Sequence, residues 1–226
     1  MPRAEILEAL QAESDCLVAG LTGVPRDAFD RPTRCEPWSA RELLAHVLVA
    51  CGRLPGMLRA PEPGSASVSA LQYFRNDRLG GTTDPERIET VRHDAARFPS
   101  GPLIVDAVAA ATRSMVTCAR AEPPHRRVRT RWDDDMLLDE YLRTRVLELA
   151  VHGLDLAAAV GAEPWLSEPA AAVTEHVLTE GCADDELNAL GWDRRTLIEK
   201  ATGRALLTEP EIRDPVVGTL LWARAG

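Results

Sequence analysis

The stretch that decides the fold is YLRTRVLELAVHGLDLAAAVG, residues 141–161. Five of its polar side chains follow one another at intervals of 4, 3, 4 and 3 residues: Tyr141, Arg145, Glu148, His152 and Asp155. This is the spacing at which a helix in a bundle turns its core positions inward, and those positions are ordinarily apolar. Leucine and valine residues flank the polar stripe on both sides. The stripe is therefore predicted to line the interior of a helical bundle.

Burial of this stripe predicts a bound cation. Burying an unpaired polar or charged group costs free energy on the order of several kcal/mol. The stripe therefore needs a metal ion or a closed network of partners. Glu148 and His152 lie one turn apart and can hold one ion. His46 is the predicted third ligand, since it is an isolated ionisable group in the apolar segment LLAHVLVA. Two histidines and one carboxylate leave a coordination position free, which is typical of catalytic zinc.

The residues alone leave alternatives open. A buried Arg145–Glu148 ion pair with hydrogen-bonded histidines would also satisfy the stripe, and the same donor set suits non-haem iron. Asp155 is predicted to act behind the ligands, by accepting a hydrogen bond from the second ring nitrogen of a ligand histidine. The remaining histidines lie in polar or ambiguous contexts and are predicted to be on the surface: His93, His125 and His176.

Two further helices are predicted before residue 60. Residues 3–22 show apolar side chains near helical spacing. Ser39 opens the second helix, which runs to about residue 59, because Ser39-x-x-Glu42 fits a capping box in which each side chain satisfies the other's backbone N–H.

The other two helices complete a bundle. Residues 101–121 predict a third, apolar helix, and the fourth begins after the acidic run 133–135 and ends at Gly161. Four helices joined by longish loops predict a mainly all-α protein, with a four-helix bundle as one domain over residues 1–161.

Residues 162–226 predict a short C-terminal extension of mixed secondary structure, packed on the bundle. A helix from 167 to about 182 and a short helix after Asp193 are expected, while the last apolar run, VVGTLLWA, suits a strand or a helix. Residues 66–99 show little pattern beyond a helical turn after Asp84-Pro85, and the basic segment HRRVRTR is predicted to be a loop.

Composition limits the partners. A formal net charge of −9 would repel duplex nucleic acid and anionic membranes, so neither is expected as a partner. The N-terminus lacks the apolar core of a signal peptide, and no run approaches transmembrane length. Five scattered cysteines without a C-x-x-C pair indicate reduced thiols in the cytoplasm. Lys200 is the single lysine among 26 basic residues, a bias typical of a high-GC, actinobacterial genome.

Two segments carry a family resemblance. CEPWSARELLAHV (35–47) resembles the C-P-G-W-T/S-x-R-D-L-x-x-H entry to the second helix of mycothiol-dependent maleylpyruvate isomerases, which belong to the DinB-like four-helix-bundle superfamily. RVLELAVHGLDLAAAVG (145–161) resembles the E-x-x-x-H-x-x-D-L helix of that family, and GWDRRTLIEKATGR (191–204) resembles the C-terminal extension of uncharacterised relatives. Glu36-Pro37 replaces the usual Pro-Gly, and residues 66–99 match no family pattern. The resemblance implies that His46, Glu148 and His152 bind zinc.

The resemblance also implies thiol chemistry. The expected cosubstrate is mycothiol, whose metal-bound thiolate would attack a small electrophilic, carboxylate-bearing substrate. A free thiol has a pKa near ~8.5, whereas a zinc-bound thiol is deprotonated. Addition to a double bond followed by release would isomerise the substrate, and addition or displacement without release would make an S-conjugate. The expected function is therefore that of a mycothiol-dependent isomerase or S-transferase.

Two side chains have competing roles within this expectation. Arg145 is predicted either to bind a substrate carboxylate or developing enolate, or to pair with Glu148. Tyr141 is predicted either to supply a proton or hydrogen bond, or to pack in the core. The competing functions are a metal-dependent hydrolase that needs no thiol, and a non-catalytic regulatory module that binds a metal or small molecule. Both a monomer and a homodimer are compatible with the sequence.

Overall fold

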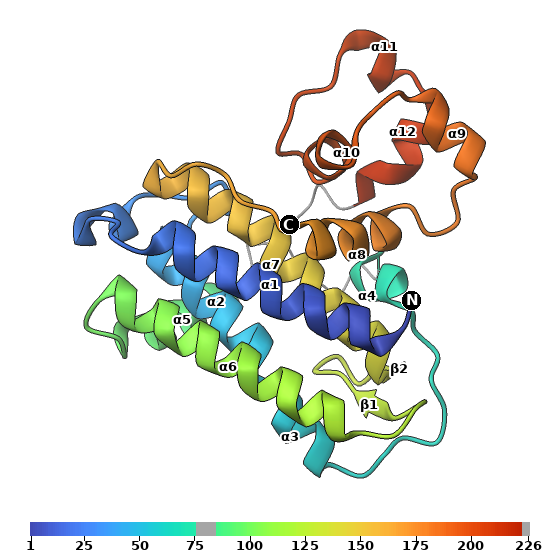
Figure 1. The fold of residues 1–226 in the computed structure, drawn as a ribbon. Helices are drawn as coiled ribbons and strands as arrows, with labels where there is room; N and C mark the ends of the chain where they lie inside the picture. Colours follow the sequence, from blue (N-terminus) through green and yellow to red (C-terminus); the bar gives the residue numbers. More distant parts are fainter. Residues whose placement is uncertain (76–84, 223–226) are drawn as a thin grey trace.

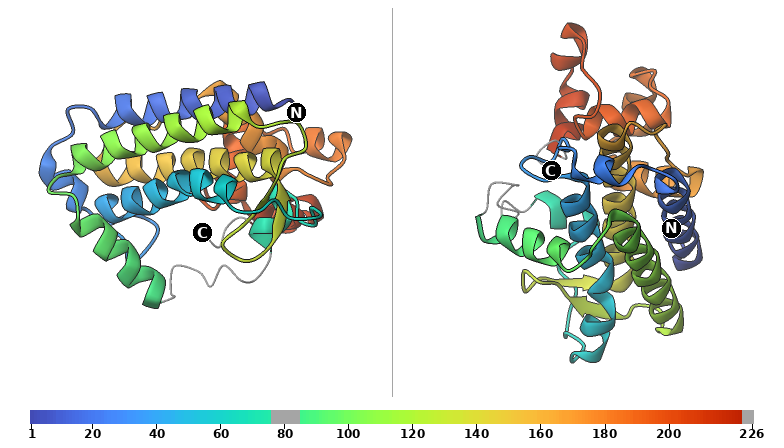
Figure 2. Two further views of the ribbon diagram at one scale, coloured as in Figure 1. Left: turned by 90° about the horizontal axis from the view of Figure 1, so that it is seen from below. Right: turned by 90° about the vertical axis from the view of Figure 1, so that its left-hand side faces the viewer.

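The computed structural model describes residues 1–75 and 85–222 (Figure 1). Four long helices form its centre: α1 (Arg3–Leu21), α2 (Ala40–Gly52), α6 (Gly101–Ala121) and α7 (Leu138–Val160). Helices α1 and α2 each pack against both α6 and α7, and the four run side by side along most of the molecule (Figures 1 and 2). The predicted four-helix bundle of a mainly α protein is confirmed.

The bundle helices begin and end close to where the sequence indicates. Ser39 opens α2 with the predicted capping box, in which the Glu42 carboxylate accepts from the Ser39 N–H at 2.7 Å and the Ser39 hydroxyl accepts from the Glu42 N–H. Helix α7 ends at Gly161, whose φ of 75° is in the left-handed region that glycine tolerates.

The second helix is shorter than predicted. It ends at Gly52, and a separate helix α3 (Leu54–Arg59) follows with Pro55 in its first turn. Proline has no N–H to continue an α-helix and is favoured at a helix start, which explains the break.

Residues 66–99 contain more structure than the sequence indicates. Helix α4 (Ala70–Arg75) lies in this stretch. The segment 76–84 that follows lies outside the described residues. The helical turn expected after Asp84-Pro85 is a full helix, α5 (Pro85–Ala96). The basic segment predicted as a loop contains β1 (Arg127–Arg129), which pairs antiparallel with β2 (Asp135–Leu137). Val128 and Met136 of this hairpin are buried in the core.

In the described part of the C-terminal extension, residues 162–222, every regular element is a helix, and loops join the helices. Its elements are α8 (Glu168–Leu178), α9 (Asp184–Ala189), α10 (Arg194–Ala201), α11 (Glu209–Ile212) and α12 (Pro215–Leu220). The expected mixture of strand and helix in this part is wrong, since the described strands precede α7. The last apolar run forms α12, a helix rather than a strand.

The extension packs on α7 and α1. Helix α8 contacts both, and the α9–α12 segment lies to one side of the bundle (Figure 1). Leu147, Val151 and Leu154 of α7 join one apolar cluster with Ile198 and Leu220. That the domain boundary falls between residues 161 and 162 stays a prediction.

Trp165 fixes the connection to α8. Its indole lies where glycines leave room on two bundle helices: a Cβ at Gly20 would lie 2.3 Å from the ring, and one at Gly153 would lie 2.8 Å from Nε1. The next turn is held by the buried Glu13 carboxylate, which accepts from the Ser167 N–H at 2.8 Å.

Helix α6 is long and apolar enough to cross a membrane by length and composition alone, so the prediction that no run approaches that length is wrong for this helix. Its apolar face packs on α1 and α2, with Ile104, Val108 and Met115 fully buried, and it carries charged residues such as Asp106. This is the burial of a bundle core helix.

Replacing Gly20 with alanine is expected to destabilise the protein by about 1–3 kcal/mol, because the new methyl group overlaps the rigid Trp165 ring. Gly52→Ala is the matched control, since a Cβ there meets no atom within 4 Å and alanine favours helix. Urea unfolding of both variants measures the difference. Equal free energies of unfolding for the two variants would contradict the described position of the Trp165 ring against Gly20.

Candidate metal centre

Three predicted ligands meet where α2 packs against α7. Glu148 Oε2 lies 3.2 Å from His46 Nε2, across 102 residues of sequence, and 3.2 Å from His152 Nε2. One ligand atom from each of the three residues lies within 4.8 Å of the others. The side chains of His46, Glu148 and His152 retain 12%, 14% and 11% exposure, so the group is enclosed but in contact with solvent.

The donor set fits a divalent metal ion. Zinc ligands at about 2.0–2.1 Å in a tetrahedron lie about 3.3 Å from one another, close to both separations seen here. Two imidazole nitrogens and one carboxylate oxygen leave at least one coordination position for another molecule. The structure brings the three residues together as predicted, and their role as ligands stays a prediction.

A second group of possible ligands lies behind His152. Its Nδ1 is 3.3 Å from Asp155 Oδ2, and the Cys35 thiol donates to the same oxygen at 3.3 Å. Arg204 already pairs with Asp155 through two hydrogen bonds, of 3.0 Å and 2.7 Å. A guanidinium so close disfavours a cation on this side, so the Nε2 side of the His152 ring is the better candidate position for a metal ion. Asp155 then lies where it was predicted, against the other nitrogen.

The charges of the three candidate ligands are coupled. Burial alone would raise the pKa of Glu148, but hydrogen bonds from His152 and His46 and the charge of Arg145 hold it well below its usual range. Burial alone would lower the pKa of His152, yet hydrogen bonds to Asp155, Cys35 and Glu148 raise it well above the ordinary value. Burial lowers the pKa of His46 to about 4, which the hydrogen bond to Glu148 only partly opposes. A proton on His152 therefore balances Glu148 when no metal is bound.

Arg145 lies one turn and Tyr141 two turns before Glu148 on α7, and each has an unused hydrogen-bonding group. The Arg145 guanidinium is 4.9 Å from the centre of the Tyr141 ring and 5.6 Å from that of Tyr73. Its Nη2 forms an ion pair with Glu148 Oε1 at 3.8 Å, too far for a hydrogen bond, and neither this nitrogen nor the Tyr141 hydroxyl has a hydrogen-bond partner. The Arg145–Glu148 ion pair offered as an alternative is therefore present at this longer distance, and both histidines contact Glu148.

Other arginines lie nearby. Burial and then the charges of Arg131 and Arg145 lower the pKa of Arg53, so the three cations are within electrostatic range of one another. On the other side, the Arg87 guanidinium of α5 lies 5.1 Å from the centre of the Trp38 ring. The surroundings are thus locally positive although the chain as a whole carries a net charge of −9.

Sequence reasoning missed several neighbours of the candidate ligands. The Trp38 ring stacks on His46, with centroids 5.1 Å apart and planes inclined by 26°. Cys35 and Trp38 belong to the quoted family-like segment, so that signal was present, but no periodicity assigns them a role. Arg204 ends another family-like segment, residues 191–204, whereas Tyr73 and Arg87 come from segments without any such signal.

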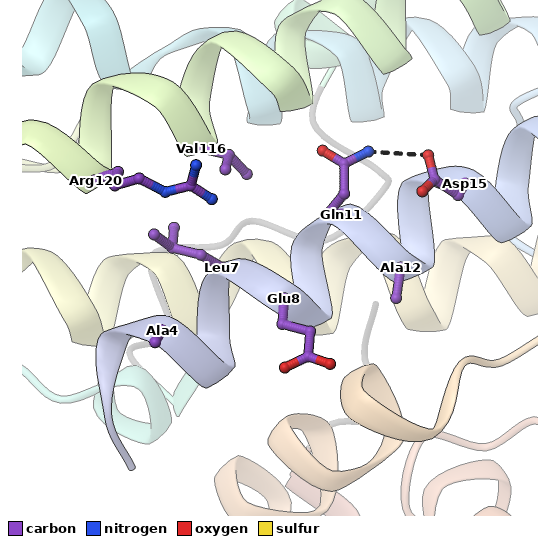
Figure 3. Close-up of a pocket in the computed structure, with 8 residues that line it drawn as sticks. All are labelled: Ala4, Leu7, Glu8, Gln11, Ala12, Asp15, Val116 and Arg120. Carbon is purple, nitrogen blue, oxygen red and sulfur yellow. Dashed lines mark hydrogen bonds between the residues drawn. The ribbon is translucent and has the colours of Figure 1, made fainter.

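A surface groove of about 400 Å³ lies elsewhere, between α1 and α6 (Figure 3). It is lined by Ala4, Leu7, Glu8, Gln11, Ala12, Asp15, Val116 and Arg120. None of the predicted site residues borders it, and its lining offers no histidine or cysteine. The donor geometry around Glu148 is therefore the stronger guide to the functional site.

Known proteins share the family and the fold of this chain. Residues 8–157 match the mycothiol maleylpyruvate isomerase N-terminal domain, and the chain belongs to that family. Two solved structures are similar: the mycothiol-dependent maleylpyruvate isomerase, with a TM-score of 0.53, and a histidine-to-alanine mutant of that enzyme, with a TM-score of 0.54. Each is 16% identical, over 79% of this chain and 70% of the other, and shows the shared fold. No curated protein has significant sequence similarity to the chain.

His46→Ala and His152→Ala are each expected to lose bound metal, because each removes one of three protein donors. His176→Ala, at an exposed position on α8 outside the group of candidate ligands, is the control and should keep the metal content of the wild-type protein. Elemental analysis of the purified variants measures this. Unchanged metal content in both ligand variants would exclude the site.

Metal binding is expected to release about one proton at pH 7. The raised pKa of His152 leaves that ring protonated without metal, whereas His46, with a pKa of about 4, is already neutral. Only neutral imidazole binds a metal, so apparent affinity should rise about tenfold per pH unit until His152 is deprotonated. Calorimetry in buffers of different ionisation enthalpy counts the protons. Binding without proton release would contradict this charge assignment.

Proposed function

We propose that the protein is a zinc-dependent enzyme that uses mycothiol as a cosubstrate, acting as an isomerase or S-transferase on a small electrophile that bears a carboxylate. The observation that carries the proposal is the convergence of His46, Glu148 and His152 beside two buried, unpartnered hydrogen-bond donors, Arg145 and Tyr141. Membership of the mycothiol maleylpyruvate isomerase family supports the choice of thiol. Another divalent metal with the same ligand preferences would serve the same role.

The metal would be held by His46, Glu148 and His152, with Asp155 orienting His152 from behind. When bound, zinc lowers the pKa of a coordinated thiol so that a thiolate is present at neutral pH. The exposure left at the three side chains gives a thiol and a substrate access to the open coordination position.

Arg145 is suited to stabilise the charge that thiol addition creates. When sulfur bonds to one carbon of a conjugated double bond, the π electrons move to the carbonyl oxygen, which becomes an enolate oxygen. The unpartnered Arg145 Nη2 is a donor for that oxygen or for a substrate carboxylate. Its buried position strengthens the interaction, because little water screens it.

The next step decides between the two activities. Rotation about the new single bond and return of the electron pair, with loss of the thiolate, give the other geometric isomer. Protonation of the carbon instead leaves an S-conjugate. Burial, as the largest effect, raises the pKa of Tyr141 and keeps its hydroxyl protonated. Tyr141 can therefore donate a hydrogen bond to the enolate, or supply its proton.

The locally positive surroundings favour an anionic substrate over a neutral one. The charges of Arg131 and Arg145 both act on Arg53, and one nitrogen of the Arg145 guanidinium has no hydrogen-bond partner in the chain. We further propose a cytoplasmic protein acting as a monomer or homodimer, without a nucleic acid or membrane partner. All five cysteines are free, which is consistent with a reducing compartment.

Incubation of the zinc-loaded protein with mycothiol and a panel of electrophiles, read by mass spectrometry, tests the proposed activity. Thiol-dependent isomerisation or conjugation is the expected result. Turnover that needs no thiol would instead favour a metal-dependent hydrolase. Ligand binding without turnover would favour a regulatory module that holds a metal or small molecule.

Arg145→Met is expected to lower kcat/KM for carboxylate-bearing electrophiles by about 10²–10³, since it removes the donor for the developing oxyanion. Arg143→Met is the matched control: it lies on the same helix, but its guanidinium pairs with Glu140 at 2.7 Å. Steady-state kinetics on both variants supply the comparison. Equal losses in the two variants would argue against a role of Arg145 in the reaction.

A further inference from the structure

We infer that Arg204, in the C-terminal extension, is a positioning residue for the metal centre: it holds the Asp155 carboxylate in the orientation that fixes His152. This inference rests on the proposed metal site. It assigns to the extension a function in the site itself, in addition to packing on the bundle.

The contact is a forked ion pair in the interior. Arg204 Nε donates to Asp155 Oδ1 at 3.0 Å, and Nη2 donates to Oδ2 at 2.7 Å. The Asp155 side chain is fully buried and that of Arg204 is 5% exposed. Two parallel hydrogen bonds fix the plane of a carboxylate as well as its position, which a single contact cannot do.

The fixed carboxylate is one step from the candidate ligand. Asp155 Oδ2 lies 3.3 Å from His152 Nδ1, and His152 Nε2 on the opposite side of the ring lies 3.2 Å from Glu148 Oε2. A hydrogen bond at one imidazole nitrogen sets the tautomer and ring orientation that the other nitrogen offers to a metal. Arg204 therefore acts on the ligand through Asp155.

The backbone around Arg204 is built to deliver the side chain to this place. Helix α10 ends at Ala201, and Gly203, with a φ of 76°, reverses the chain as few other residues can. The N–H groups of Arg204 and Ala205 then both donate to the Glu199 carbonyl, at 2.6 Å and 2.9 Å.

The same turn is tied to the loop before α2. The Arg204 carbonyl accepts from Arg34 Nη1 at 3.1 Å. The next residue along that loop, Cys35, donates its thiol to Asp155 Oδ2 at 3.3 Å. Two segments that are distant in sequence thus meet at one carboxylate of α7, and both donate to Asp155 Oδ2.

A merely structural role would be the simplest alternative, in which the pair only attaches the extension. A buried ion pair is weak evidence for stability, because desolvation offsets most of the attraction. Arg204 pairs with Asp155, the carboxylate that contacts the candidate ligand His152. Another arginine of the extension pairs with a residue outside the candidate site. Arg194, for example, donates to Glu175 of α8 at 2.7 Å.

Zinc affinity and the cobalt spectrum of the full-length protein test the inference without relying on activity. Zinc affinity is measured by competition with a chelator, and the absorption bands of bound Co²⁺ report ligand geometry. Arg204→Gln is expected to weaken zinc binding about 10–100-fold and to shift the cobalt bands. Arg204→Lys keeps the charge without the fork and should fall between Arg204→Gln and the wild type.

Two controls separate positioning from attachment. Arg194→Gln removes a matched arginine ion pair of the extension and should leave zinc affinity within about twofold of the wild type, as expected of a site that it does not contact. In an Asp155→Asn background, Arg204→Gln should add little further loss, since Arg204 acts through Asp155. Full additivity of the two substitutions would overturn the inference.

Wild-type zinc affinity and an unchanged cobalt spectrum in a folded Arg204→Gln protein would also overturn it. If Arg204→Gln does not fold, the zinc affinity of Arg204→Lys is measured instead. Wild-type zinc affinity in Arg204→Lys would then overturn the inference. Failure of the wild-type protein to bind zinc or cobalt would instead overturn the proposed function. The two failures are therefore distinguishable.

Discussion

The rest of the structure depends on one largely enclosed carboxylate, Glu148, which two imidazole rings from different helices face at 3.2 Å. A carboxylate in a helical core is costly unless cations or donors surround it. His46 can meet it only if α2 packs on α7 at this level, and the capping box at Ser39 sets where α2 begins. The packing of α2 on α7 and the formation of the candidate site therefore depend on each other.

His152 links two polar regions of the interior. Its Nε2 faces Glu148 and the open part of the site, while its Nδ1 faces Asp155, where the pre-α2 loop and the C-terminal extension converge. The region around Glu148 has hydrogen-bond donors without partners, as a site for exchangeable molecules requires. The region around Asp155 has its hydrogen bonds formed, as expected of residues that orient a metal ligand.

The sequence predicts the parts of this arrangement that are periodic or local. The polar stripe on α7 is visible because helical spacing repeats, Ser39 and Gly161 mark helix ends by local chemistry, and His46 is conspicuous in an apolar run. The break after Gly52 and the three-residue strands are too short for periodicity to reveal. Arg204 is 49 residues from Asp155, so only the tertiary packing of the extension brings them together.

Overall charge and local charge lead to different expectations here. A net charge of −9 argues against polyanionic partners at the surface, yet arginines gather beside the candidate metal centre. Native cores rarely leave a buried guanidinium nitrogen and a buried phenol without partners, because each such group costs about 1–3 kcal/mol. Arg145 Nη2 and the Tyr141 hydroxyl are two such groups, although Arg145 also forms a long ion pair with Glu148. That both remain open beside three converging metal donors favours a site that binds an anionic ligand next to an ion.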